Sequence, residues 1–182
     1  MTMMKKIRLI VPCRVAYLNC WEPASQYGGD KYFSLTAIVS KDDGDAIALI
    51  SGAVEKLRRE AASEWNGMSA ENIKNPIHDG DVEKPGNPIY KNTLYFSAKS
   101  KTAPQIVDCE CKTITEQNEL YSGCFANVSF TLHAYNCGGI KGISAWLGNI
   151  QKICDGERIG GKILATEEFK PISVMKARAI NE

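Results

Sequence analysis

Histidine is scarce in this sequence, and the usual spacing of metal-binding cysteines is missing. Only His78 and His133 occur among 182 residues, and none of the seven cysteines forms a C-x-x-C pair. Cys109 and Cys111 flank one glutamate and would share a face of a strand, but a fourth ligand for a tetrahedral zinc site would be hard to supply. We therefore expect no metal site and no cofactor, and cysteines that serve as small apolar residues in a reducing compartment.

The sequence also lacks an excess of basic residues. Its 22 lysines and arginines face 21 aspartates and glutamates, which gives a formal net charge of +1. A chain with so little net charge has no long-range positive field. Any nucleic-acid site must therefore be a local patch of cations.

Long apolar runs are absent as well. No window approaches the roughly 20 apolar residues of a transmembrane helix. The apolar run near the start is broken by Arg8 and Pro12, which argues against a secretory signal. We expect a cytoplasmic protein without membrane contact.

The residues that are present predict one domain over 1–182, mainly β with one long helix. Period-two alternation of apolar and polar residues predicts strands at 14–22, 31–39 and 94–101, a further strand at 104–113 and a hairpin within 121–161. An apolar stripe at three- and four-residue spacing predicts a helix over 45–64, preceded by acidic residues that can cap it. Its members are Ile47, Ile50, Val54, Leu57 and Ala61.

Two segments do not fit regular elements. Residues 66–92 contain Pro76, Pro85 and Pro88 together with several glycines, which predicts a long loop insertion. A short C-terminal extension is expected from about residue 162.

The hairpin has an unusual outer face. Apolar residues from Ala126 to Ala134 alternate with a second set that is small and polar in the middle and aromatic toward the ends. That second set consists of Phe125, Asn127, Ser129, Thr131, His133 and Tyr135. The glycines in Asn136-Cys137-Gly138-Gly139 predict the turn.

The same kind of face recurs on the other predicted strands, with Tyr32 on one and Tyr95, Lys99 and Lys101 on another. Aromatic rings stack on nucleic-acid bases whatever the sequence, and cations neutralise phosphates. We therefore expect a surface for single-stranded nucleic acid. Its candidate residues are Arg14, Tyr32, Tyr95, Lys99, Lys101, Phe125, His133, Tyr135, Lys141, Trp146 and Arg158. These features suit single-stranded DNA and single-stranded RNA equally.

Several blocks, in order, give the chain a family resemblance. They include RVAY at 14–17, DGD at 79–81, AKS at 98–100, YSGC at 121–124, AYN at 134–136 and LGNIQK at 147–152. Together they resemble a family of phage and prophage single-stranded DNA-binding proteins, related to those of podophages. The resemblance implies an OB fold, a partly open five-stranded Greek-key barrel, and a role in coating single-stranded DNA during phage replication and recombination in the bacterial host cell. It also implies phage replication or recombination proteins as partners, and leaves a homodimer open.

The chain departs from this family at its end, where an acidic tail would recruit such partners. The last residues are KPISVMKARAINE, with Glu182 as their one acidic residue.

Two other functions remain open from the sequence. A metal-dependent nuclease would use carboxylates such as Asp79, Asp81, Asp108 and Glu110, which must converge to bind two metal ions. A structural phage protein would use the aromatic face for a protein partner, since aromatics are also enriched at protein interfaces. Our preferred prediction is a non-enzymatic binding protein without catalytic residues.

Overall fold

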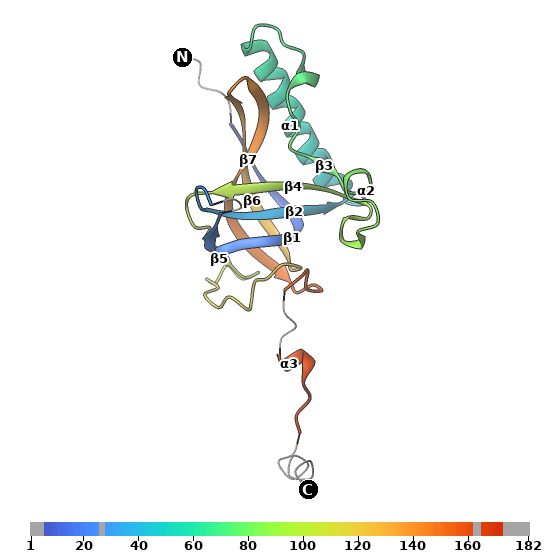
Figure 1. Ribbon diagram of the computed structural model, residues 1–182, viewed down its shortest axis with the longest axis vertical. Coiled ribbons are helices and arrows are strands. Elements are labelled where there is room, and N and C mark those ends of the chain that lie inside the picture. Colours follow the sequence, from blue (N-terminus) through green and yellow to red (C-terminus); the bar gives the residue numbers. More distant parts are fainter. Residues whose placement is uncertain (1–5, 26–27, 162–164, 173–182) are drawn as a thin grey trace.

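The computed structural model describes residues 6–25, 28–161 and 165–172, and a closed β-barrel forms its centre (Figure 1). Its strands are hydrogen-bonded in the order β4-β2-β1-β6-β7, and a further pairing of β4 with β7 closes the ring. The five strands are β1 (Lys6–Ala24), β2 (Tyr32–Ser40), β4 (Thr93–Ser100), β6 (Phe125–Cys137) and β7 (Ile140–Cys154). The predicted OB-type barrel is confirmed, and it is closed where a partly open barrel was expected.

Strand β1 is longer than predicted, because it begins at Lys6 and not at Arg14. Arg8 and Pro12, which interrupt the apolar run, are exposed on its outer side. The inward side carries Leu9, Val11 and Cys13, all buried. Before Arg14 this strand pairs with β6 alone, and a strand with one unpaired edge tolerates proline.

The second half of β1 contains an irregularity that re-aims its side chains. The register to β2 shifts between Ala16 and Asn19, and Tyr17 between them has a φ of +48°. Val15 and Ala16 are both buried, so the period-two alternation stops there. A bulge of this kind bends the strand and redirects a side chain. Tyr17 consequently stands outward, with 57% of its surface exposed.

The β6–β7 hairpin matches the prediction closely. Gly138 and Gly139 form the two-residue turn with φ of +57° and +84°, the combination that a type I′ turn requires. The predicted apolar face of β6 is buried. Farther along, Ser129 Oγ accepts a hydrogen bond of 2.7 Å from the Asn149 backbone amide, where the register shifts.

Helix α1 (Gly44–Glu64) covers the end of the barrel and packs against β1, β6 and β7 (Figure 1). The carboxylate of Asp43 caps it by accepting a 3.0 Å hydrogen bond from the Ala46 amide. Its buried stripe is Ala46, Ile50, Val54, Leu57, Ala61 and Ala62. The predicted stripe therefore does face the core, except for Ile47, which is half-buried.

The long insertion after α1 is built from short elements. They are η1 (Ala70–Asn72), β3 (His78–Asp79), α2 (Gly80–Glu83) and η2 (Pro88–Tyr90). Strand β3 pairs with β4, and Lys41 Nζ lies 2.7 Å from a carboxylate oxygen of both Asp79 and Asp81. The insertion is thus fixed to the turn between β2 and α1.

The remaining elements are small. Strand β5 (Ile106–Val107) pairs with β7 and is much shorter than the predicted 104–113. Helix α3 (Ala165–Glu168) belongs to the predicted C-terminal extension, of which 162–164 and 173–182 lie outside the described residues. In the part of the chain that the structure describes, no helix combines the length and the apolar character needed to cross a membrane.

Candidate nucleic-acid interface

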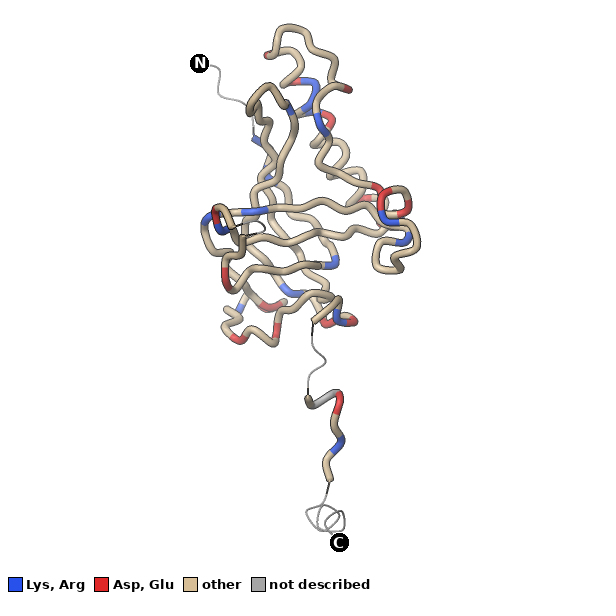
Figure 2. The backbone as a smooth tube through the Cα atoms, in the orientation of Figure 1, with Lys and Arg blue, Asp and Glu red and all other residues tan. Residues whose placement is uncertain are grey.

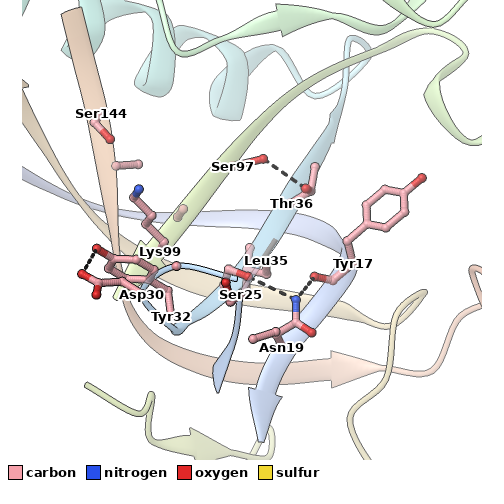
Figure 3. A pocket seen from close by; sticks show the side chains of 15 residues that line it. Tyr17, Asn19, Ser25, Asp30, Tyr32, Leu35, Thr36, Ser97, Lys99 and Ser144 are labelled. Carbon is pink, nitrogen blue, oxygen red and sulfur yellow. Dashed lines mark hydrogen bonds between the residues drawn. The ribbon is translucent and has the colours of Figure 1, made fainter. Parts of the chain in front are cut away.

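A groove of about 620 Å³ runs over the outer face of β2 and β4. We call it the β2–β4 groove. Tyr32 and Lys99 stand toward one side of it and Tyr17 stands at the other, with small polar residues between them (Figure 3). Its lining is Tyr17, Asn19, Ala24, Ser25, Gly29, Asp30, Tyr32, Ser34, Leu35, Thr36, Ser97, Ala98, Lys99, Ser144 and Ala145.

The floor of the groove is made of hydroxyl and amide groups. Thr36 Oγ1 and Ser97 Oγ lie 3.2 Å apart on neighbouring strands, and Asn19 Nδ2 donates a 3.2 Å hydrogen bond to Ser34 Oγ. These groups carry no charge and are short, so a ligand backbone can approach the sheet closely. The floor therefore suits a flexible chain that is held at its sides.

Two cations lie beside the ring of Tyr32, at an end of β4 where Figure 2 shows basic residues along the backbone. Lys99 Nζ lies 4.7 Å and Lys101 Nζ 5.5 Å from the ring centroid, both within cation–π range. Lys101 Nζ also donates to Asp30 Oδ2 at 2.9 Å, which lowers the pKa of Asp30 and raises the pKa of Lys101 from their ordinary values. Tyr32 Oη donates to the same Asp30 oxygen at 3.3 Å.

A second aromatic group lies beside this cluster because of the barrel closure. Lys99 of β4 pairs with Trp146 of β7, and Trp146 is 42% exposed. The His133 ring stacks on Trp146 with centroids 3.9 Å apart, and Lys6 Nζ lies 4.5 Å from the Trp146 ring. All five barrel strands thus contribute to one aromatic and cationic surface, which continues outward from the β2–β4 groove.

Three other candidates form a separate group near the start of β6. Arg14 Nε and Nη2 donate to the backbone carbonyls of Gly123 and Glu157 at 3.2 and 2.7 Å, so its guanidinium ties two loops together. Phe125 lies under Arg14, 5.9 Å from its Cζ to the ring centroid. Arg158 stacks on Tyr121 at 3.8 Å. The structure does not place these residues on the groove.

The ring of Tyr95 is engaged inside the chain. It stacks on His78 with centroids 5.1 Å apart and contacts the edge of Tyr90 at 4.7 Å. Its hydroxyl donates to Glu83 Oε2 at 3.3 Å, and burial together with this carboxylate raises the pKa of Tyr95. Tyr95 therefore packs the insertion onto β4 and presents little ring surface to a base.

Tyr135 and Lys141 lie near the tip of the hairpin. The Tyr135 ring covers Gly142, where a Cβ would overlap it. Lys141 Nζ lies 5.3 Å from the centroid of Trp65, which follows α1. These contacts attach the hairpin tip to itself and to the end of α1, away from the β2–β4 groove.

Of the fifteen residues that line the groove, the predicted site residues include Tyr32 and Lys99 alone, and the aromatic Tyr17 and the acidic Asp30 are the most consequential omissions. Tyr17 lies on a strand in which both sides carry apolar and polar residues, so alternation does not show which side is buried. The bulge that exposes Tyr17 has no clear signal in the sequence. Asp30 belongs to a segment that is typical of a turn-rich loop. The sequence gives one indication of its role: Asp30 directly precedes Lys31 and Tyr32, at the start of a predicted strand.

The carboxylates of the alternative nuclease hypothesis are spread apart. Asp79 and Asp81 share Lys41, whereas Asp108 Oδ1 accepts hydrogen bonds from the amides of Glu110 and Lys112 in the loop after β5. Among the described residues, no group of three or more histidine, cysteine or acidic side chains is arranged to hold a metal ion.

Comparison with protein families gives one match across nearly the whole chain. Residues 5–179 match the model of the family described as "Enterobacter phage Enc34, ssDNA-binding protein". The chain belongs to this family. A curated relative, protein p50 of Acyrthosiphon pisum secondary endosymbiont phage 1, is 30% identical over 174 residues, which cover 88% of this chain and 91% of the relative.

Solved structures confirm the fold that the family shares. The single-stranded DNA-binding protein of bacteriophage Enc34, in complex with ssDNA, has a TM-score of 0.69 at 23% identity and covers 85% of this chain and 89% of its own. The single-stranded DNA-binding protein gp2.5 of bacteriophage T7 has a TM-score of 0.56 at 14% identity, with 93% and 99% covered. The fold implied by the family resemblance is therefore confirmed, and the match over residues 5–179 confirms the resemblance itself.

Proposed function

We propose that this protein binds single-stranded DNA without sequence preference through the β2–β4 groove and the adjoining Trp146 surface. The observation that carries the proposal is the Tyr32 ring flanked by Lys99 and Lys101 in a groove with an uncharged polar floor. Membership of a single-stranded DNA-binding protein family supports it. So does the location, since OB folds use the face of strands 2 and 3 for oligonucleotides, which here are β2 and β4.

Each group has a defined part in this proposal. A base stacks on Tyr32, and its neighbours stack on Tyr17 at one end and Trp146 at the other, because every base has a π-face. The ammonium groups of Lys99, Lys101 and Lys6 then lie beside the phosphates and release counterions from the strand. The small side chains between the aromatic residues let the sugar–phosphate backbone reach the sheet.

In this proposal the protein binds DNA and does not cleave it. Its setting would be the cytoplasm of a bacterial host, where a phage exposes single strands during replication and recombination. His133 acts by supporting Trp146. Other candidates have structural contacts within the chain, and we place them outside the groove-binding set; they are Arg14, Phe125, Tyr95, Tyr135, Lys141 and Arg158.

The direct test titrates a fluorescent oligo-dT with the protein at low and moderate salt, with magnesium and with EDTA. We expect binding that weakens with salt, both with magnesium and with EDTA, and an oligonucleotide that is still intact after the titration. Loss of the oligonucleotide only with magnesium would indicate a nuclease. An absence of binding at low salt would contradict the proposal and favour a protein partner for the aromatic face.

A further inference from the structure

The β2–β4 groove contains one acidic residue, Asp30, among its described lining residues. This residue forms an ion pair with Lys101, a cation beside the groove. Asp30 Oδ2 accepts hydrogen bonds from Lys101 Nζ at 2.9 Å and from Tyr32 Oη at 3.3 Å. Figure 3 shows the carboxylate against the Tyr32 hydroxyl, at the side of the groove where Lys99 stands. The Asp30 carboxylate thus accepts hydrogen bonds from an ammonium group and a hydroxyl group of two residues that the proposed function assigns to DNA.

A carboxylate and a phosphodiester present the same chemistry to these donors. Both are anionic oxygens that accept charge-assisted hydrogen bonds from ammonium groups. Asp30 and Lys101 are both largely exposed, with 66% and 69% of their side chains accessible. An exposed ion pair is weak, so a phosphate of an arriving strand can replace the carboxylate without disturbing the core.

The backbone beside Asp30 leaves room for the exchange. Gly28 and Gly29 precede it, and the space in which a Cβ would stand is open at both. Gly28 has a φ of +75°, which a glycine adopts without strain. No neighbouring atom packs against the backbone at these two glycines, and the exposed Asp30 side chain can leave Lys101 by rotating into another rotamer.

We propose that Asp30 is an internal competitor for the phosphate site at Lys101, which lowers the affinity of the groove and is displaced when single-stranded DNA binds. This inference rests on the proposed function of the groove. Asp30 would thus lower the affinity of each single contact at Lys101. Tight binding of single-stranded DNA would then require several groove contacts at once.

Ion release provides a quantitative signature. Binding at a free lysine releases condensed cations from the strand, about 0.7 per neutralised phosphate. When Lys101 leaves Asp30, the freed carboxylate attracts a cation and offsets part of that release. Removing the carboxylate should therefore raise the affinity and also make its dependence on salt steeper.

The test compares Asp30→Asn, Lys101→Gln and the double variant with the wild type, by fluorescence anisotropy of oligo-dT over a salt series. Asparagine keeps the shape of Asp30 without its charge. We expect Asp30→Asn to bind about threefold tighter or more at low salt, with a slope of log K against log salt steeper by up to ~0.7. Glu116→Gln, in the loop before β6, makes the same change of net charge away from the groove and should leave affinity nearly unchanged.

The double variant separates competition at Lys101 from general repulsion of DNA by Asp30. Competition predicts that the gain from Asp30→Asn largely disappears when Lys101 is already glutamine, whereas repulsion predicts the same gain in both backgrounds. Equal or weaker binding by Asp30→Asn, or a gain that persists without Lys101, would overturn the inference while wild-type binding upholds the proposed function. If neither the wild type nor Asp30→Asn binds, both proposals fail.

Discussion

Trp146 and His133 stack face to face across β6 and β7, with ring centroids 3.9 Å apart and an interplanar angle of 28°. The imidazole covers one face of the indole and holds its orientation, and 42% of the Trp146 surface remains exposed. Lys6 lies over the same indole. A surface aromatic residue supported in this way is pre-organised, because little side-chain freedom is left to lose on binding.

We expect Trp146→Ala to weaken oligo-dT binding by about 1–3 kcal/mol, the usual effect of removing the aromatic partner of one stacked base. Trp146→Phe should retain part of the affinity. The measurement is fluorescence anisotropy at fixed salt. Phe169→Ala is a matched control, since Phe169 is an exposed aromatic residue just after α3, and it should bind as the wild type does.

Lys99→Gln should lower both affinity and its salt dependence. Removing one lysine that neutralises a phosphate should reduce the slope of log K against log salt by ~0.7. Lys112→Gln removes an equal charge from the loop after β5, where Lys112 pairs with Glu110, and provides the control. If the two variants have the same slope as the wild type, Lys99 does not contact phosphate.

Tyr95→Ala should affect folding and leave binding intact. Its half-buried ring packs between His78 and Tyr90, so truncation removes contacts between β4 and the insertion and should lower the free energy of unfolding by about 1–3 kcal/mol. Urea denaturation measures this decrease, and anisotropy at a temperature where the variant is folded measures binding. Weaker binding by the folded variant would return Tyr95 to the DNA surface.

The stability of the fold should decrease in mild acid partly through His133. Burial lowers the pKa of His133 below the ordinary value of 6.5, so the unfolded chain takes up this proton at a higher pH than the folded chain does. The contribution is complete above about pH 6.5 and is lost as the pH falls through the folded pKa. We expect His133→Gln to lose less stability than the wild type between about pH 7.5 and about pH 5.5, as measured by urea denaturation.

Gly148→Ala should destabilise the barrel. A Cβ there would overlap Ser129 Oγ and press on the Ser129 backbone, and overpacking of this kind typically costs about 1–3 kcal/mol. Gly52→Ala provides the contrast, because the space beside this helical glycine is open and alanine favours a helix. Thermal unfolding should show the first variant less stable than the wild type and the second more stable.

Sequence reasoning predicts the elements whose pattern is regular. The β6 face from Ala126 to Ala134 alternates without interruption, and the Gly138-Gly139 turn has one natural conformation. The first half of β1 escapes prediction because Arg8 and Pro12 look like breaks in an apolar run. In a strand they occupy the outer side, so they do not interrupt the buried one.

Sequence alternation predicts which side chains can reach the candidate site, and it does not predict which of them are covered. Which face a residue occupies follows from alternation, and this is enough for Tyr32, Lys99, Lys101 and Trp146. Whether that face is open or covered depends on segments distant in sequence, and the insertion that covers the Tyr95 ring cannot be inferred from β4 itself. A residue such as the one at the β1 bulge escapes because the bulge changes the period on which alternation depends.

The pairing of β4 with β7 joins just two residue pairs, Ala98 with Ala145 and Lys99 with Trp146. The second pair links a phosphate-binding candidate to a stacking candidate, so the seam of the barrel runs through the proposed DNA surface. A DNA strand bound across this seam would contact both β4 and β7, and so would hold together the two barrel strands that share the fewest residue pairs. Binding of DNA would then stabilise the folded protein by mass action, and it would add contacts across the pair of barrel strands that shares the fewest of its own.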